Sequence, residues 1–151
     1  MTLIEEASEE LKRADHLLYV SLKYTRTVDV IKSIIDRLIS GISLAIDALL
    51  ERAKERKKVK EIPSNAGLKA ELVKKLFNDE KITDMVIFYQ TLKKISRAEY
   101  RRSNEYRRHV TMTAITDSGI LLITMETIRE YYDRTVGYVA YADSLLNPRK
   151  E

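Results

Sequence analysis

Cysteine and tryptophan are absent from this 151-residue chain, and glutamine occurs only once, at Gln90. Without cysteine the chain can form no disulfide, no thiol nucleophile and no zinc–thiolate site. Asp15 and His16 are two neighbouring potential metal ligands, but no third ligand follows at a suitable spacing. No metal site and no cofactor are therefore expected. Together with the many Lys, Arg and Glu residues, these absences favour a thermophilic source.

Glycine and proline are scarce as well, with four and two residues respectively. All-β folds need frequent Gly and Pro turns, so the composition favours helices. No apolar run approaches the roughly 18 residues that cross a bilayer. The first residues, MTLIEEASEELKR, are acidic and amphipathic, whereas a signal peptide is first basic and then apolar. We therefore expect a cytoplasmic protein with no membrane partner.

The remaining composition is typical of a globular protein, with 44% hydrophobic and 33% charged residues. A chain of this length can bury about 68–70% of its unfolded surface. We expect a single domain over residues 1–146 and a tail over 147–151. The expected fold class is mainly α, an antiparallel helical bundle with a small β-hairpin inserted before the last helix.

Apolar residues that recur every three or four positions predict five helices. Gly41 lies in the middle of the second, where it costs about 1 kcal/mol relative to Ala, so a neighbouring helix is expected to approach closely there. A capping box at Ser96–Glu99 would restart the fourth helix. In the third, Leu68, Leu72, Leu76 and Phe77 are expected to face inwards. The helices are expected over residues 2–24, 30–58, 68–77, 82–108 and 124–146, with a break at 24–29. The last of them is expected to start at Thr124 or at Glu126.

The period of the sequence changes after His109. Val110–Thr116 alternates and is rich in β-branched residues, residues 117–119 have turn chemistry, and Ile120–Thr124 is a short apolar run. This pattern predicts a β-hairpin. The alternative is one helix through the whole stretch, which would have to accommodate Gly119 and six β-branched residues.

Positive charge is concentrated in residues 93–109, KKISRAEYRRSNEYRRH. This segment holds seven Lys/Arg and two Glu, a balance of +5, whereas the whole chain is +4. Two glutamates cannot neutralise seven cations, so either acidic helices such as the N-terminal one cover the segment or an anion binds it. A second basic run, Arg52–Lys60, has a structural explanation, because cations at a helix C-terminus complement its dipole.

Arg102 and His109 are seven residues apart, so on a helix they share a face and lie about 10 Å apart along its axis. Glu105, four residues before His109, is then close enough to orient the imidazole. An arginine that holds a phosphate and a histidine that moves a proton are what metal-free cleavage of RNA at its 2′-hydroxyl requires. Tyr100 and Tyr106 could stack on bases, but their spacing more simply predicts inward packing.

The run from Arg102 to His109 resembles the signature of the HEPN superfamily of helical bundles, which is an arginine, four to six residues and a histidine. Polar Ser103 stands where that signature usually has a polar residue, but Thr111 replaces the aromatic residue that often follows. The resemblance implies RNA cleavage across a dimer interface, with His109 as general base and Arg102 as phosphate clamp. Other HEPN proteins only bind or assist nucleotidyltransferases. The segments DHLLYVSLKYTRT and EYRRHVTM are also similar to an archaeal family, which implies no activity.

These features lead to the hypothesis of an RNA- or polyanion-binding, HEPN-like protein, with metal-independent ribonuclease activity as a further step. Whether the chain is an enzyme stays open. A structural alternative makes His109 a junction residue paired with Glu105 and the arginines a solvated face. The binding residues would be Lys93, Lys94, Arg97, Arg101, Arg107 and Arg108, supported by Glu105.

The alternative function is an assembly or adaptor protein whose basic face binds an acidic protein partner. Nine tyrosines against two phenylalanines suggest amphipathic contact surfaces. With the Tyr-rich last helix and the wide apolar faces, this predicts a homodimer.

Overall fold

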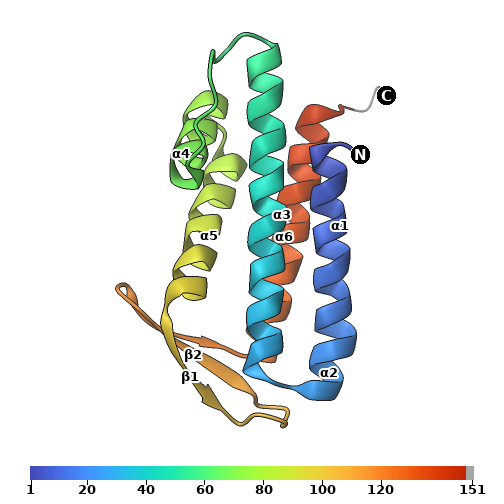
Figure 1. Cartoon of the computed structure of the whole chain (residues 1–151), viewed down its shortest axis with the longest axis vertical. Helices are drawn as coiled ribbons and strands as arrows, with labels where there is room; N and C mark the ends of the chain where they lie inside the picture. The colour runs from blue at the N-terminus through green and yellow to red at the C-terminus, as the bar shows by residue number, and fades with distance from the viewer. Residues whose placement is uncertain (149–151) are drawn as a thin grey trace.

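The computed structural model describes residues 1–148, which form a mainly helical protein with a small three-stranded antiparallel sheet (Figure 1). Positions 149–151 of the expected tail lie outside the described residues. The helices are α1 (Leu3–His16), η1 (Leu17–Ser21, a π-helical turn), α2 (Leu22–Thr25), α3 (Val28–Glu55), α4 (Ala66–Phe77), α5 (Glu80–Arg97) and α6 (Met125–Leu146). The strands are β1 (Glu99–Ser103), β2 (Thr111–Thr116) and β3 (Gly119–Ile123).

Side chains cap the start of every long helix. Each cap accepts a hydrogen bond from a backbone N–H of the first turn, which has no partner within the helix. The predicted helix starts at Thr2 and Thr124 are confirmed. The predicted break over residues 24–29 is confirmed too, because α2 ends at Thr25 and the next residue, Arg26, has a left-handed backbone with φ 51°. The five caps are Thr2, Thr27, Asn65, Asp79 and Thr124.

α3 is the central helix, packed against α1, α4, α5 and α6 (Figure 1). Gly41 of α3 faces α1, and a Cβ built at Gly41 would lie 3.5 Å from Leu11 Cδ2 and 3.7 Å from the carbonyl oxygen of Ala7. The close approach expected at Gly41 is therefore present, but it leaves room for a methyl group. The fully buried side chains of α3 include Ile31, Ile34, Leu38, Ile42 and Leu49.

The sheet lies across the end of the helices where α5 finishes and α3 begins (Figure 1). Its strand order is β1-β2-β3, and both neighbouring pairs are antiparallel. Tyr100 and Arg102 of β1 pair with Ala114 and Met112 of β2, both fully buried, so these positions form the inner face. Because side chains alternate along a strand, Arg101 lies on the outer face.

β2 and β3 are joined at Asp117 and Ser118, and Gly119 follows with φ 125°, a conformation that favours glycine. β2 pairs with β3 from Met112↔Ile123 to Thr116↔Gly119. The alternative of one helix through residues 110–124 is therefore wrong.

The prediction of a helix through residues 82–108 is also wrong. α5 ends at Arg97, Ala98 is extended, and Glu99–Ser103 forms β1. Ser96–Glu99 is thus no capping box. Pairing of β1 along the whole of its length with β2 outweighs the helix propensity of its arginines, which is a weak preference.

Leu68 was expected to face inwards but is 60% exposed, while Leu72, Leu76 and Phe77 are partly buried against the core. Among residues 1–148, no helix combines the length and apolar character needed to cross a membrane.

Candidate functional site

The basic segment spans three elements at the sheet end of the molecule. Lys93, Lys94 and Arg97 belong to the last turns of α5, whereas Arg101 and Arg102 belong to β1. Arg107, Arg108 and His109 follow in the loop between β1 and β2. The prediction that Arg102 and His109 share one helical face is therefore wrong.

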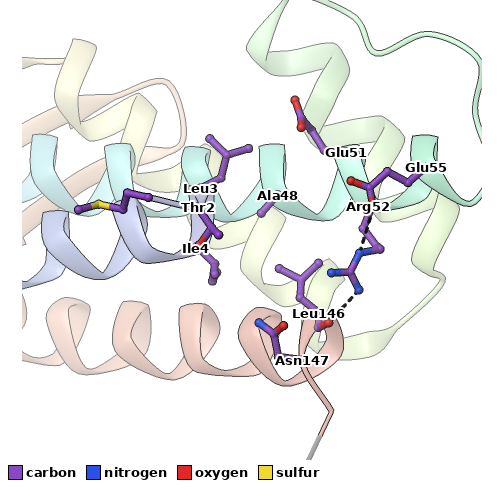
Figure 2. Close-up of a pocket in the computed structure, with 10 residues that line it drawn as sticks. Thr2, Leu3, Ile4, Ala48, Glu51, Arg52, Glu55, Leu146 and Asn147 are labelled. Carbon is purple, nitrogen blue, oxygen red and sulfur yellow. Dashed lines mark hydrogen bonds and ion pairs between the residues drawn. The ribbon is translucent and has the colours of Figure 1, made fainter.

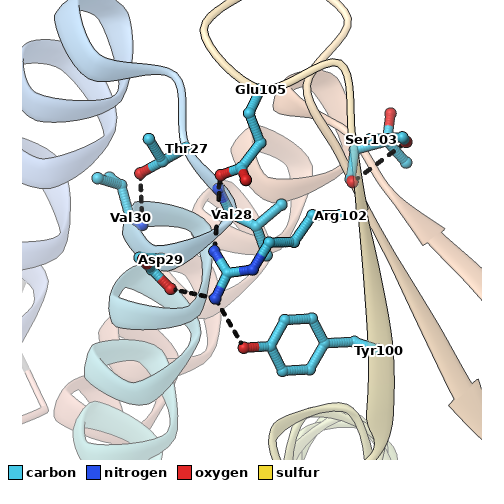
Figure 3. Close-up of polar contacts among 9 residues, drawn as sticks. Thr27, Val28, Asp29, Val30, Tyr100, Arg102, Ser103 and Glu105 are labelled. Atoms are coloured by element: carbon cyan, nitrogen blue, oxygen red, sulfur yellow. Dashed lines mark hydrogen bonds and ion pairs between the residues drawn. The ribbon is translucent and has the colours of Figure 1, made fainter.

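The side chain of Arg102 points from the inner face of the sheet towards the start of α3 (Figure 3). Its Nη2 donates to Asp29 Oδ1 at 2.8 Å and to the Tyr100 hydroxyl at 3.1 Å. Its Nη1 lies 3.6 Å from Glu105 Oε2. The hydrogen bond from Arg102 lowers the pKa of the Asp29 carboxyl. Arg102 is thus neutralised by carboxylates of its own chain.

Glu105 contacts the start of α3 and not His109. Its Oε2 accepts a hydrogen bond from the backbone N–H of Val28 at 3.1 Å (Figure 3). A carboxylate at a helix N-terminus satisfies a free N–H and interacts favourably with the helix dipole. The expectation that Glu105 orients the His109 imidazole is not met, because no described hydrogen bond or ion pair joins them.

His109 lines a cavity of about 260 Å³ beside the start of α6. Arg108 and Asn104 line it from the same loop, and Glu126 lines it from α6. Arg102 is not among the lining residues. The structure therefore does not bring Arg102 and His109 together at one cavity.

The other basic side chains have few internal partners. Within residues 1–148, no carboxylate forms an ion pair with Arg97, Arg101, Arg107 or Arg108, all of which are exposed. Lys94 lies 4.0 Å from Asp117. We call Lys93, Lys94, Arg97, Arg101, Arg107 and Arg108 the basic surface.

The acidic first turn of α1 does not cover the basic surface. Figure 1 shows that α1 begins at the opposite end of the molecule from the sheet, and Glu5 and Glu6 lie in its first turn.

Tyr106 is 75% exposed beside Arg107, contrary to the expectation of inward packing. Its φ of 68° and its backbone hydrogen bond to the Arg26 carbonyl hold the loop against the start of α3.

A different hollow, of about 390 Å³, lies where α1 begins and α6 ends (Figure 2). Arg52 extends across it, donating from Nη1 to the Leu146 carbonyl at 2.8 Å and lying 3.6 Å from Glu55. This contact satisfies a free carbonyl at the C-terminus of α6. It agrees with the structural explanation of the basic run that starts at Arg52.

Sequence reasoning missed several residues of this region. Asp29 carried no signal, because its contact with Arg102 joins residues 73 positions apart. Thr27 is the cap of α3 and was a usable local signal, although the helix was expected to begin at residue 30. Asp117 was recognised only as a turn residue. Among residues 1–148, no group of three or more His, Asp or Glu side chains could hold a metal ion.

Comparisons with protein-family models, with curated proteins and with solved structures found no match to this chain.

Proposed function

We propose that this protein binds RNA, or another polyanion of similar charge density, through the basic surface. The observation that carries the proposal is the set of four exposed arginines, Arg97, Arg101, Arg107 and Arg108, with no carboxylate partner among the described residues. Positively charged side chains that lie close together without carboxylate partners repel each other and attract polyanions. Arginines that neutralise RNA phosphates would also release the counterions condensed on the strand, which favours binding.

The arrangement of the basic surface suits an extended single strand. β1 has five residues and so spans about 16 Å, with Arg97 before it and the Arg107 and Arg108 loop beyond it. Arg101 lies between them on the outer face. Exposed Tyr106 adds an aromatic ring on which a base could stack. This last feature favours RNA over a polyanion without bases.

Binding can be tested by the anisotropy of a labelled single-stranded RNA as the salt concentration rises. Affinity should fall steeply, and replacing Arg107 and Arg108 by Gln should reduce the log–log slope by about 1.4, since each phosphate contact contributes about 0.7. The matched control replaces exposed Lys58 and Lys60, which removes the same charge at the other end of α3. Equal losses in both pairs, or no binding at low salt with micromolar protein, would refute the proposal.

Cleavage is a narrower hypothesis, carried over from the HEPN resemblance. Arg102 is engaged by Asp29 and Glu105 and does not line the cavity beside His109, so binding is better supported than cleavage. If the protein does cleave RNA, His109→Ala should abolish product formation while binding is retained. Cleavage that survives this substitution would exclude His109 as the general base.

The alternative is an adaptor that binds an acidic protein partner. The observation in its favour is an apolar patch on the outer face of the sheet, where Ile115, Ile120 and Leu122 are 40%, 67% and 61% exposed. It shares this face with Arg101. Apolar side chains rimmed by cations match a partner with apolar and acidic side chains. An adaptor should recover a protein and no nucleic acid in a pull-down, and replacing Ile120 and Leu122 by Thr should abolish recovery of that protein.

A homodimer remains part of the proposal. Tyr19, Val20, Tyr24 and Val136 are exposed along η1, α2 and α6, with Tyr19 and Tyr132 in edge-to-face contact at 6.3 Å. Such amphipathic rings are enriched at interfaces. Sedimentation at tens of micromolar should give the mass of a dimer, and a monomer peak would refute the assignment.

A further inference from the structure

An open cavity of about 400 Å³ lies between the last turns of α5 and the turn that joins β2 to β3. Lys93, Lys94 and Arg97 line the cavity from α5, and Asp117 lines it from the turn. Gly67 adds the first turn of α4. Half of the basic surface is therefore gathered around one concave site.

The cavity has a surplus of positive charge. Its three cations face a single carboxylate, that of Asp117, which leaves a net charge of +2. Asp117 is 82% exposed at the side chain and lies 4.0 Å from Lys94 Nζ. Within residues 1–148, no ion pair involves Lys93 or Arg97. Asp117 therefore marks where an anionic oxygen fits beside Lys94, and two further negative charges would neutralise the site.

A phosphomonoester matches this requirement better than a phosphodiester. At pH 7 a monoester carries about −1.5 to −2 charges and three strong acceptor oxygens, whereas each diester of a nucleic-acid strand carries one charge. The N–H of Gly67 has no carbonyl partner within α4, and it lies at the positive end of the helix dipole. It adds a donor of the right sign to the three cationic side chains.

The volume of the cavity exceeds that of a phosphate group and falls in the range of small-molecule pockets, about 300–1,000 Å³. Ala98 and Ile115 give part of its wall an apolar character. Gln90 Nε2 donates to Glu71 and Thr116 Oγ1 donates to the Gly119 carbonyl, which leaves the oxygens of Gln90 and Thr116 as acceptors. A sugar and a base attached to the phosphate would find partners on these residues.

We propose that this cavity binds the phosphomonoester of a nucleotide, presented either by a free mononucleotide or by the phosphorylated end of an RNA strand. Arg97 lines the cavity and β1 begins two residues later at Glu99, so a strand lying along Arg101 would end here. The RNA source rests on the proposed function, whereas the mononucleotide source does not. Asp117 competes with the phosphate for Lys94 in both cases.

Two sets of probes distinguish the sources. Calorimetry with adenosine 5′-monophosphate, adenosine and inorganic phosphate tests the free nucleotide. Anisotropy with one RNA hexamer, phosphorylated at its 5′ end, at its 3′ end or at neither, tests the strand end. We expect the monophosphate to bind and adenosine not to bind. One phosphorylated hexamer should bind about tenfold more tightly than the unphosphorylated one, the effect of one charge-assisted hydrogen bond.

Substitutions link the preference to the cavity. Lys94→Gln combined with Arg97→Gln should remove the preference for the phosphorylated hexamer, and Asp117→Asn should strengthen it several-fold. Arg107→Gln combined with Arg108→Gln removes the same charge outside the cavity, so it should weaken all three hexamers equally and leave monophosphate binding unchanged. Thermal unfolding checks that each variant is folded.

The outcomes separate this proposal from the proposed function. Equal affinity for the three hexamers without binding of the monophosphate would overturn the cavity assignment and leave RNA binding intact. Binding of the monophosphate without binding of any hexamer would support the cavity and refute the RNA function. A preference that persists in the folded Lys94→Gln, Arg97→Gln variant would place the phosphate site elsewhere and overturn the assignment.

Discussion

The carboxylate of Glu105 accepts a hydrogen bond from the backbone N–H of Val28 at 3.1 Å, although 77 positions separate the two residues. The same carboxylate approaches Arg102, so it links the basic segment to the start of the central helix. This contact holds the loop after β1 in place and presents Arg107 and Arg108 to solvent.

Removing the Glu105 carboxylate should therefore destabilise the protein. Because Glu105 acts as a partly buried cap, Glu105→Ala should lower the free energy of unfolding by about 1 kcal/mol, within the 0.5–2 kcal/mol measured for caps. Glu105→Gln keeps an acceptor for Val28 and should cost less. Urea unfolding measures both. Glu99→Ala is the control, because exposed Glu99 forms no described ion pair and should change stability by less than about 0.5 kcal/mol. A loss as large for Glu99 would contradict the assignment.

The ion pair between Asp29 and Arg102 should make stability depend on acid pH. Its hydrogen bond lowers the pKa of Asp29 in the folded state below the unfolded value, so its contribution is present above about pH 4 and is lost as the pH falls through the lowered pKa. Asp29→Asn should be less stable than the original chain at pH 7, and the difference should vanish towards pH 2. Urea midpoints across this range measure it. Asp133→Asn, at an exposed site on α6, should show no such trend.

Gly41 can be replaced by a small residue but not by a large one. A Cβ there would make ordinary contacts at 3.5 Å and 3.7 Å, so Gly41→Ala should gain up to about 1 kcal/mol from helix propensity. Gly137 of α6 is the matched control, since no atom lies within 4 Å of its Cβ position. Gly137→Ala should gain as much. Gly41→Leu should destabilise the protein, because the larger side chain would clash with α1, whereas Gly137→Leu should not. Thermal unfolding measures both variants. Equal destabilisation by the two leucines would contradict the close packing at Gly41.

The Tyr141 hydroxyl donates a hydrogen bond to Asp79 Oδ2, while Oδ1 of the same carboxylate caps α5. This bond raises the pKa of Tyr141 and lowers that of Asp79. Tyr141→Phe should cost about 1 kcal/mol at pH 7. Since the folded pKa of Tyr141 is raised, the difference should hold below pH 10 and shrink as the pH rises through that pKa. Tyr138→Phe removes a more exposed contact with Arg134 and should cost less.

The helices could be predicted from the sequence because their signals are local. Thr2 and Thr124 are good caps followed by apolar residues at helical spacing, and the structure has helices that start there. The close approach at Gly41 followed from its position in a long apolar helix. These features depend on residues within a few turns of each other.

β1 could not be predicted in the same way, because its stability comes from pairing with β2 across a loop. Glu99, Arg101 and Arg102 are acceptable helix formers, and nothing local excludes a helix. The loop between the strands contains two left-handed residues, Asn104 and Tyr106. Asparagine tolerates that conformation and was a usable signal, whereas tyrosine was not. The error in β1 misplaced the part of the candidate site from Arg101 to His109, whereas Lys93, Lys94 and Arg97 lie on a helix as expected.

β1 is also an outer strand of the sheet, so one side of its backbone has no strand partner. Such an edge strand can pair with a strand from another molecule and start aggregation, and charged side chains discourage this pairing. Arg101, exposed on the outer face, is therefore expected to discourage such pairing at β1, whereas β3, the opposite edge strand, exposes Ile120 and Leu122. Variants that neutralise Arg101 would leave β1, like β3, open to pairing with strands of other molecules. A loss of ligand affinity in such variants can therefore be interpreted only if the protein does not aggregate.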